Sequence, residues 1–344
     1  MKPILYSSHL YQECIKSFKN HIQRGLFKIR RKKRLAQLKV SNREGLDLAQ
    51  INCGLTSTCD HSSSTTLCVR ASLSYEHFFQ QPMDKKNILV NRDHQVTLMA
   101  IGLRKYSNYA EYLHAIRKHS FFERKAKKAV RTGYYFENFH WENYCPDIRA
   151  IRESTKWRAF GLPPDPYVLT PEALKTEPNR FTEIQSPGCH SHWEKWFGIF
   201  QKKPGYCQGQ IKTDQQLIAY ARIRRAGNTV KYAEIIGHFE CLNNGVMAFL
   251  HLEIVKYFLI NQHSEPDKGI EYITYNNLER GADGLFFWKR KALFTPYEIA
   301  FSKPPLPRGF DPQKYLVLNP DLDTTQVEAT SHYQTHGHLE GRTY

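Results

Sequence analysis

The sequence lacks any apolar run of about 18 residues, the length that would predict a membrane-spanning helix. Its N-terminal segment also lacks the apolar stretch and small-residue cleavage site of a secretory signal. Acidic residues are scarce, because 33 Asp and Glu stand against 49 Lys and Arg and give a net charge of +16. We therefore expect a cytoplasmic protein with anionic partners. A location at the inner membrane surface is left open as an alternative.

No Cys-x-x-Cys pair occurs, although that spacing is typical of zinc-ligand sets and redox motifs. We therefore expect reduced thiols, with neither a disulfide framework nor a zinc site. The run Cys189-His190-Ser191-His192 contains ligand residue types, but no second ligand pair has matching spacing. We interpret it as a polar loop after Pro187-Gly188 and predict no metal. The eight cysteines are Cys14, Cys53, Cys59, Cys68, Cys145, Cys189, Cys207 and Cys241.

The chain has 344 residues, of which 41% are apolar, so two domains with a packed core are expected. Ser and Thr crowd the segment before residue 70, and Pro-rich residues 303–308 indicate a stiff linker. These shifts in composition predict four parts. They are a basic arm and linker (1–70), an N-terminal lobe with a basic helix (71–145), a mixed core (146–302), and a linker with a small helical tail module (303–344).

Two segments concentrate the positive charge. Residues 1–40 contain eleven Lys and Arg and a single acid, Glu13, and Arg24–Arg34 is the densest part. The second segment, Arg117–Arg131, predicts a basic helix that ends before Gly133. Either segment suits contact with RNA, an anionic polysaccharide or a membrane surface. A solvated basic helix face explains the same residues, and the sequence leaves these alternatives open.

The stretch Leu217–Phe301 organises the rest of the chain. Alternating apolar residues predict two antiparallel strands joined at Ala226–Asn228, and in the second strand Tyr232, Glu234 and Ile236 fall on one face. A helix that follows a strand through a glycine loop has unpaired amides at its start, which suits a pyrophosphate-bearing cofactor. The predicted elements are strands 216–225, 229–237, 271–275 and 296–301, with helices over 246–260 and 278–293.

This order of elements resembles the GNAT superfamily of acyl-CoA-dependent N-acyltransferases. Lys231–Gly237 matches the central strand, Leu242–Met247 the cofactor loop and Glu271–Tyr275 the next strand. With the basic helix Arg124–Gly133 before it, the chain is most similar to the two-lobed Fem-type branch. The resemblance implies an α+β fold, in which helices flank a mixed, mainly antiparallel sheet. It also implies that acyl-CoA binds at Asn243, Asn244, Gly245, Val246, Met247 and Asn276.

The resemblance further implies direct transfer, in which an amine attacks a thioester carbonyl and a base takes its proton. Glu234 and His238, at the end of the central strand, are the candidate bases, and Tyr275 is a candidate acid. An ion pair of Glu234 with Arg222 or Arg224, a capping role for His238 and a core position for Tyr275 stay open as alternatives.

The tail, Phe310–Leu322 and Ser331–Arg342, resembles a helical module found beside bacterial glycosyltransferases and surface-polysaccharide proteins. Its three histidines, His332, His336 and His338, we interpret as part of a helix end at Gly337. The sequence therefore favours an N-acyltransferase of surface glycan modification. Two alternatives stay open, because only Gly245 follows the family's cofactor-loop pattern. They are a Fem-like transferase that uses aminoacyl-tRNA, and a non-catalytic module that binds an anionic polymer.

Overall fold

The computed structural model describes residues 48–51, 59, 68, 97–119, 121–154, 174, 177–278, 283–301, 306–307, 309–322, 329–330, 332–333, 337 and 342–344. The basic segment Arg24–Arg34 and the histidines His336 and His338 lie outside these residues. The described strands are β1 (Leu48–Ile51), β2 (Thr97–Gly102), β3 (Tyr134–Asn138), β4 (His192–Lys202), β5 (Cys207–Gln208), β6 (Ile211–Lys212), β7 (Gln215–Ala226), β8 (Thr229–Gly237), β9 (Tyr272–Asn277) and β10 (Thr295–Phe301). The α-helices are α4 (Tyr109–His119), α5 (Phe122–Arg131), α6 (Cys145–Glu153), α8 (Val246–Asn261), α9 (Asp283–Lys291) and α10 (Pro312–Leu318), and the short 3-10 turns are η2 (Leu103–Lys105), η3 (Trp141–Tyr144) and η4 (Phe239–Asn244).

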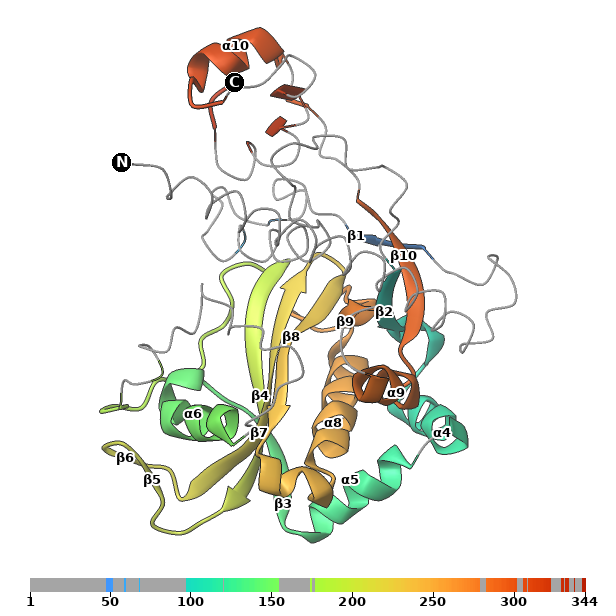
Figure 1. The fold of residues 1–344 in the computed structure, drawn as a ribbon, viewed down its shortest axis with the longest axis vertical. Coiled ribbons are helices and arrows are strands. Elements are labelled where there is room, and N and C mark those ends of the chain that lie inside the picture. Colours follow the sequence, from blue (N-terminus) through green and yellow to red (C-terminus); the bar gives the residue numbers. More distant parts are fainter. Residues whose placement is uncertain are drawn as a thin grey trace, which may run out of the picture.

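One eight-stranded sheet forms the centre of the molecule, in the order β1-β10-β2-β9-β8-β7-β4-β3 (Figure 1). Its neighbours pair antiparallel except for β1 with β10 and β8 with β9, which run parallel. This confirms the predicted α+β fold with a mixed, mainly antiparallel sheet and flanking helices. Strands β2 and β3, from the predicted N-terminal lobe, join the same sheet as the strands of the predicted core. The boundary between those two parts stays a prediction.

Helix α8 lies at the centre of the larger core, between one face of the sheet and helices α4, α5 and α9 (Figure 1). The sequence predicts a single apolar stripe on this helix, along Met247, Leu250, Ile254, Tyr257 and Phe258. The helix is instead buried around most of its circumference, since Ala248, Phe249 and Leu252 are buried as well. A helix sandwiched between a sheet and other helices needs apolar residues on every side.

The opposite face of the sheet carries a second, aromatic core under α6. Trp196 and Phe200 alternate along β4 with Trp193 and Phe197, which point to the α8 side. Phe139, Tyr144, Trp196 and Phe200 meet with ring centroids 5.1 to 6.1 Å apart, in edge-on geometry for the pairs Phe139–Tyr144 and Phe139–Phe200. The period-two alternation of β4 thus supplies both cores at once.

The face predicted for β8 is wrong at its second half. The register pairs Ile223 with Tyr232 and Arg222 with Glu234, so Ala233 is an extra residue, a β-bulge. Tyr232 therefore packs on the α8 side, whereas Glu234 and Ile236 turn to the α6 side. A single inserted residue reverses the alternation, and a sequence pattern of period two gives no sign of it.

The tail module folds around Tyr315, which is fully buried. Asp311 caps α10 by accepting hydrogen bonds from the amides of Gln313 and Lys314. Tyr315 Oη lies 2.9 Å from His332 Nδ1. A side-chain carbon at Gly337 would lie 2.1 Å from the same oxygen, so this position has room only for glycine. Within the described residues, no helix has both the length and the apolar character needed to cross a membrane.

Candidate functional site

Strands β8 and β9 begin as a parallel pair and then separate. Their register covers Thr229–Lys231 opposite Tyr272–Thr274. Beyond Lys231, no strand of the described residues pairs with the side of β8 that faces β9. The bulge at Ala233 lies at the start of this segment. An open strand edge can accept the backbone of an extended ligand, so this edge is the first element of the candidate site.

The loop that follows β8 leads straight into α8. Gly245 has φ of +84°, a left-handed conformation that glycine adopts without strain. A side-chain carbon at Gly245 would lie 2.2 Å from the Lys125 carbonyl oxygen, and one at Gly237 would lie 2.8 Å from Met247 Sδ. The missing side chains therefore let α5 and the end of β8 approach the start of α8.

Other residues predicted to bind the cofactor lie around this helix start. Asn243 is exposed and its carbonyl accepts a hydrogen bond of 2.9 Å from Lys128 Nζ, while Asn244 donates to Tyr134 Oη at 3.4 Å. Val246 is fully buried, so it can contribute its amide but not its side chain. Asn276, with φ of +54°, lies near the end of β9. The loop and the start of α8 thus bring Asn243, Asn244 and Val246 to one region, whereas Asn276 belongs to β9.

The two candidate bases differ in surroundings. Glu234 forms a partly buried ion pair with Arg152 of α6, which also donates to Tyr220 Oη at 2.9 Å. Arg152 was not among the partners expected for Glu234. Of those, Arg222 lies opposite Glu234 on β7, and Arg224 pairs with Glu194 at 2.9 Å. His238 is partly exposed at the end of β8, where it precedes η4 without a side-chain capping bond.

The candidate acid, Tyr275, lies in an aromatic cluster on the α8 side of the sheet. Its ring is 5.4 Å from Tyr232 and 5.9 Å from Trp288. The bulge therefore places Tyr275 and Glu234 on opposite faces. The two can act on one substrate only through the gap between β8 and β9.

His251 is a buried polar group that the sequence analysis did not single out as functional. It is fully buried in α8, with Nε2 2.9 Å from Tyr112 Oη and Nδ1 2.9 Å from Tyr232 Oη. Tyr112 donates to the Ala292 carbonyl at 3.0 Å, so Nε2 carries the proton and donates to Tyr112, and Nδ1 accepts from Tyr232. Burial lowers the pKa of His251 to about 3. The ring is neutral at pH 7 and joins α4, α8 and β8.

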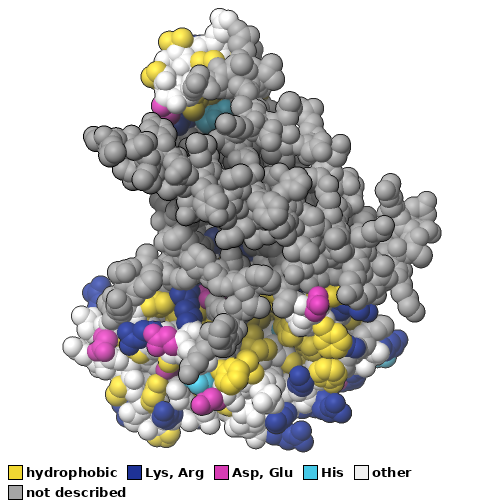
Figure 2. All heavy atoms as spheres, in the orientation of Figure 1, with side chains coloured by type: hydrophobic (Ala, Val, Ile, Leu, Met, Phe, Trp, Pro, Cys, Tyr) yellow, Lys and Arg dark blue, Asp and Glu magenta, His cyan; other side chains and the backbone are white. Residues whose placement is uncertain are grey.

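The basic helix α5 presents an exposed charged face, as predicted. Arg117 and Lys127 both pair with Glu123, whereas Arg124, Lys128 and Arg131 are exposed to solvent. A hollow of about 790 Å³ opens beside this helix, between α4, α5 and α8, with Tyr109, Leu113, Phe249 and Leu252 among the residues that line it. Figure 2 shows blue Lys and Arg side chains next to yellow apolar ones at this part of the surface. None of the predicted catalytic residues lines the hollow.

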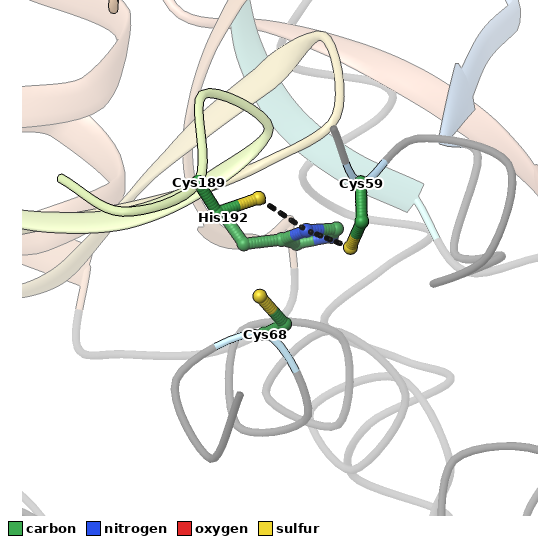
Figure 3. A group of neighbouring side chains, drawn as sticks. All are labelled: Cys59, Cys68, Cys189 and His192. Carbon is green, nitrogen blue, oxygen red and sulfur yellow. Dashed lines mark hydrogen bonds between the residues drawn. The ribbon is translucent and has the colours of Figure 1, made fainter. Parts of the chain in front are cut away.

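Four side chains of the types that bind metals meet beside the start of β4 (Figure 3). They are Cys59, Cys68, Cys189 and His192, and their ligand atoms all lie within 4.8 Å of one another. The sequence analysis interpreted Cys189–His192 as a polar loop because it found no second ligand pair with matching spacing, and the fold brings such a pair beside it. The second pair, Cys59 and Cys68, is distant in sequence and reaches the loop through the fold. The signal available in the sequence was the Cys-x-x-His spacing of Cys189 and His192, which equals that of a Cys-x-x-Cys pair.

The thiols of Cys59 and Cys189 are protonated at neutral pH in the absence of a cation. Burial, followed by the neighbouring Cys68 and Cys189, raises the pKa of Cys59 well above its usual range. Burial likewise raises the pKa of Cys189, against the opposing effect of backbone amides. A bound divalent cation reverses this preference, because metal-coordinating thiols are deprotonated.

Comparisons with known proteins add little to these observations. No family model matches the chain. No curated protein matches it significantly. Among solved structures, the chain is similar to the C-terminal domain (DUF2156) of an Agrobacterium fabrum protein described as a lysylphosphatidylglycerol synthetase, with 12% identity and a TM-score of 0.34. The match covers 59% of this chain and 58% of that one.

Proposed function

We propose that the chain is an acyltransferase that binds an acyl-CoA donor where β8 and β9 separate and transfers the acyl group to an amine. In this reaction the amine nitrogen forms a bond to the thioester carbonyl carbon, and the carbon–sulfur bond breaks. The amine loses a proton to a base, and the thiolate of coenzyme A leaves and is protonated. The observation that carries the proposal is the parallel β8–β9 pair, whose register ends after Lys231.

Three features support an acyl-CoA donor at this position. The β8 edge can hydrogen-bond an extended pantetheine chain as an added strand. The start of α8 follows β8 after the 3-10 turn η4, and the unpaired amides of a helix start favour a pyrophosphate group. The bulge at Ala233 twists the strand at the point where the thioester would lie.

Donor binding is tested with Asn243→Asp, which places a negative charge beside the start of α8 without changing the size of the side chain. We expect acetyl-CoA to raise the melting temperature of the wild-type chain. At a ligand concentration of 100 times its Kd, binding adds about 2.7 kcal/mol to the free energy of unfolding. The variant should lose most of that shift, because the new charge repels the pyrophosphate. Asn108→Asp is the matched control, since Asn108 caps α4 through Oδ1 and an aspartate caps equally well. Equal shifts for all three proteins, or no shift with any acyl-CoA, would exclude this donor site.

The base is tested separately with Glu234→Gln and His238→Asn in an assay of acyl transfer to a panel of amines. If Glu234 is the base, its variant keeps donor binding but turns over about 100-fold more slowly. Gln can still accept a hydrogen bond from Arg152, so the fold is retained, which urea unfolding checks. Wild-type turnover in Glu234→Gln with a large loss in His238→Asn assigns the role to His238. Unchanged turnover in both variants refutes the acid–base scheme.

A second donor, aminoacyl-tRNA, is favoured by the exposed basic face of α5. Arg124, Lys128 and Arg131 lie on this face, and Lys128 also contacts the loop before α8. Charge reversal of Arg124 and Arg131 should then weaken tRNA binding and reduce its dependence on salt concentration, because each lost phosphate contact lowers the salt slope. An unchanged salt slope would exclude α5 as the RNA surface. Acyl-CoA binding should be the same in this variant.

A further inference from the structure

The cluster of Cys59, Cys68, Cys189 and His192 is buried in the described part of the chain. Cys68 and His192 are fully buried, Cys189 is nearly so, and Cys59 is half-buried. None of the three cysteines is joined in a disulfide. Figure 3 shows the three sulfur atoms and the imidazole ring turned toward a common centre. Four polar ligand groups that converge in a buried space are the usual surroundings of a structural metal ion.

The separations between ligand atoms agree with tetrahedral coordination. His192 Nδ1 lies 3.3 Å from Cys59 Sγ and 3.7 Å from Cys189 Sγ. For zinc, with bonds of about 2.3 Å to sulfur and about 2.0 Å to nitrogen, a tetrahedron places sulfur and nitrogen about 3.5 Å apart and two sulfurs about 3.8 Å apart. The widest pair in the cluster is within 4.8 Å, so a shift of about 1 Å brings all four ligands to bonding distance.

The scaffold holds two of the ligands firmly. His192 is the first residue of β4 and pairs with Ala226 of β7. The amide of Gly227, in the turn between β7 and β8, donates to the Ser191 carbonyl at 3.0 Å. The loop with Cys189 and His192 is therefore fixed on the end of the sheet. Such a loop presents a preformed half-site to which the other two cysteines can add.

We propose that Cys59, Cys68, Cys189 and His192 form a structural zinc site. Three thiolates and one imidazole are a ligand set that zinc takes in closed, four-coordinate sites, and no position is left for a substrate or a water molecule. The ion would join the segment that carries Cys59 and Cys68 to the first residue of β4. This role is independent of the acyl-transfer proposal, because none of the four ligands is a residue that the proposal assigns to donor binding or to catalysis.

The test is the metal content of the full-length chain, purified without chelators and measured by mass spectrometry of the elements. We expect about one zinc ion per wild-type chain and almost none in Cys68→Ser. Two matched controls should keep the full zinc content. Cys207→Ser removes an exposed cysteine outside the cluster, and His190→Ala removes the neighbouring histidine, which pairs with Glu265.

A second measurement uses the wild-type chain alone, so that the test still works if Cys68→Ser fails to fold. Wild-type chain freed of zinc under reducing conditions is titrated with Co²⁺, and a thiolate-to-cobalt charge-transfer band with tetrahedral ligand-field bands is expected at about one equivalent. Zinc should abolish both bands by displacement. Equal zinc content in the wild type and Cys68→Ser, or a Co²⁺ spectrum without the thiolate band, would each overturn the proposal.

Discussion

Gly245 offers the sharpest test of how α8 is packed, because two separate costs act on any side chain at this position. With φ of +84°, an alanine would be held in the left-handed region, at a cost of about 1 to 2 kcal/mol. Its side-chain carbon would also lie 2.2 Å from the carbonyl oxygen of Lys125. That oxygen belongs to the backbone of α5 and cannot rotate away. Relieving the overlap requires a shift of α5 against α8, at about 1 to 3 kcal/mol. We expect Gly245→Ala to lower the free energy of unfolding by about 2 to 5 kcal/mol.

Gly133→Ala separates the two costs. Gly133 has φ of +88°, nearly the same backbone conformation, but a side-chain carbon there would have no neighbour within 4 Å. This variant should therefore lose about 1 to 2 kcal/mol, from the backbone conformation alone. Urea unfolding followed by tryptophan fluorescence measures both variants against the wild type. If Gly245→Ala costs no more than Gly133→Ala, α5 does not lie against the start of α8 as the structure has it.

Two further predictions concern buried polar groups. Because the pKa of His251 is lowered to about 3, the unfolded chain takes up a proton below pH 6.5 that the folded chain does not, so stability falls by about 1.4 kcal/mol per pH unit below that value. Between pH 7.5 and 5 this amounts to about 2 kcal/mol, which His251→Gln should remove from the pH dependence of urea unfolding; equal pH dependence in both proteins would contradict the assignment. Asp267→Asn should destabilise the chain by about 3 to 5 kcal/mol, because Asp267 is buried and accepts from Lys195 Nζ at 2.7 and 2.8 Å. Asp214→Asn, at an exposed ion pair, should change the unfolding free energy by less than about 1 kcal/mol, and similar losses in the two variants would show that burial does not matter at Asp267.

Local patterns in the sequence were sufficient for most of the described elements. The pattern of apolar residues predicted β7 and β8, and Gly133 marked the end of α5. These signals act between residues a few positions apart, through side-chain periodicity and capping bonds. Such interactions are encoded wherever the segment lies in the fold.

Local patterns predicted less of the candidate site, namely the faces of its side chains and the partners of its charges. The sequence placed Tyr232 and Glu234 on one face, whereas the bulge at Ala233 puts them on opposite faces. It expected Glu234 to pair with an arginine of the neighbouring strand and did not foresee Arg152 of α6, which forms an ion pair with it. Both differences come from how strands and helices meet, which residue spacing within one strand does not record.

The sequence by itself determined the order of strands and helices, the basic face of α5 and the glycine that begins α8, since each rests on local conformation or composition. Only the tertiary structure decided which distant residues share a space. Cys59 and Cys68 reach Cys189 and His192 across more than a hundred residues, and Tyr112, Tyr232 and His251 meet from three different elements. Contacts of this kind depend on the packing of the whole sheet. For this chain, they are the contacts on which its proposed metal site and its buried polar core depend.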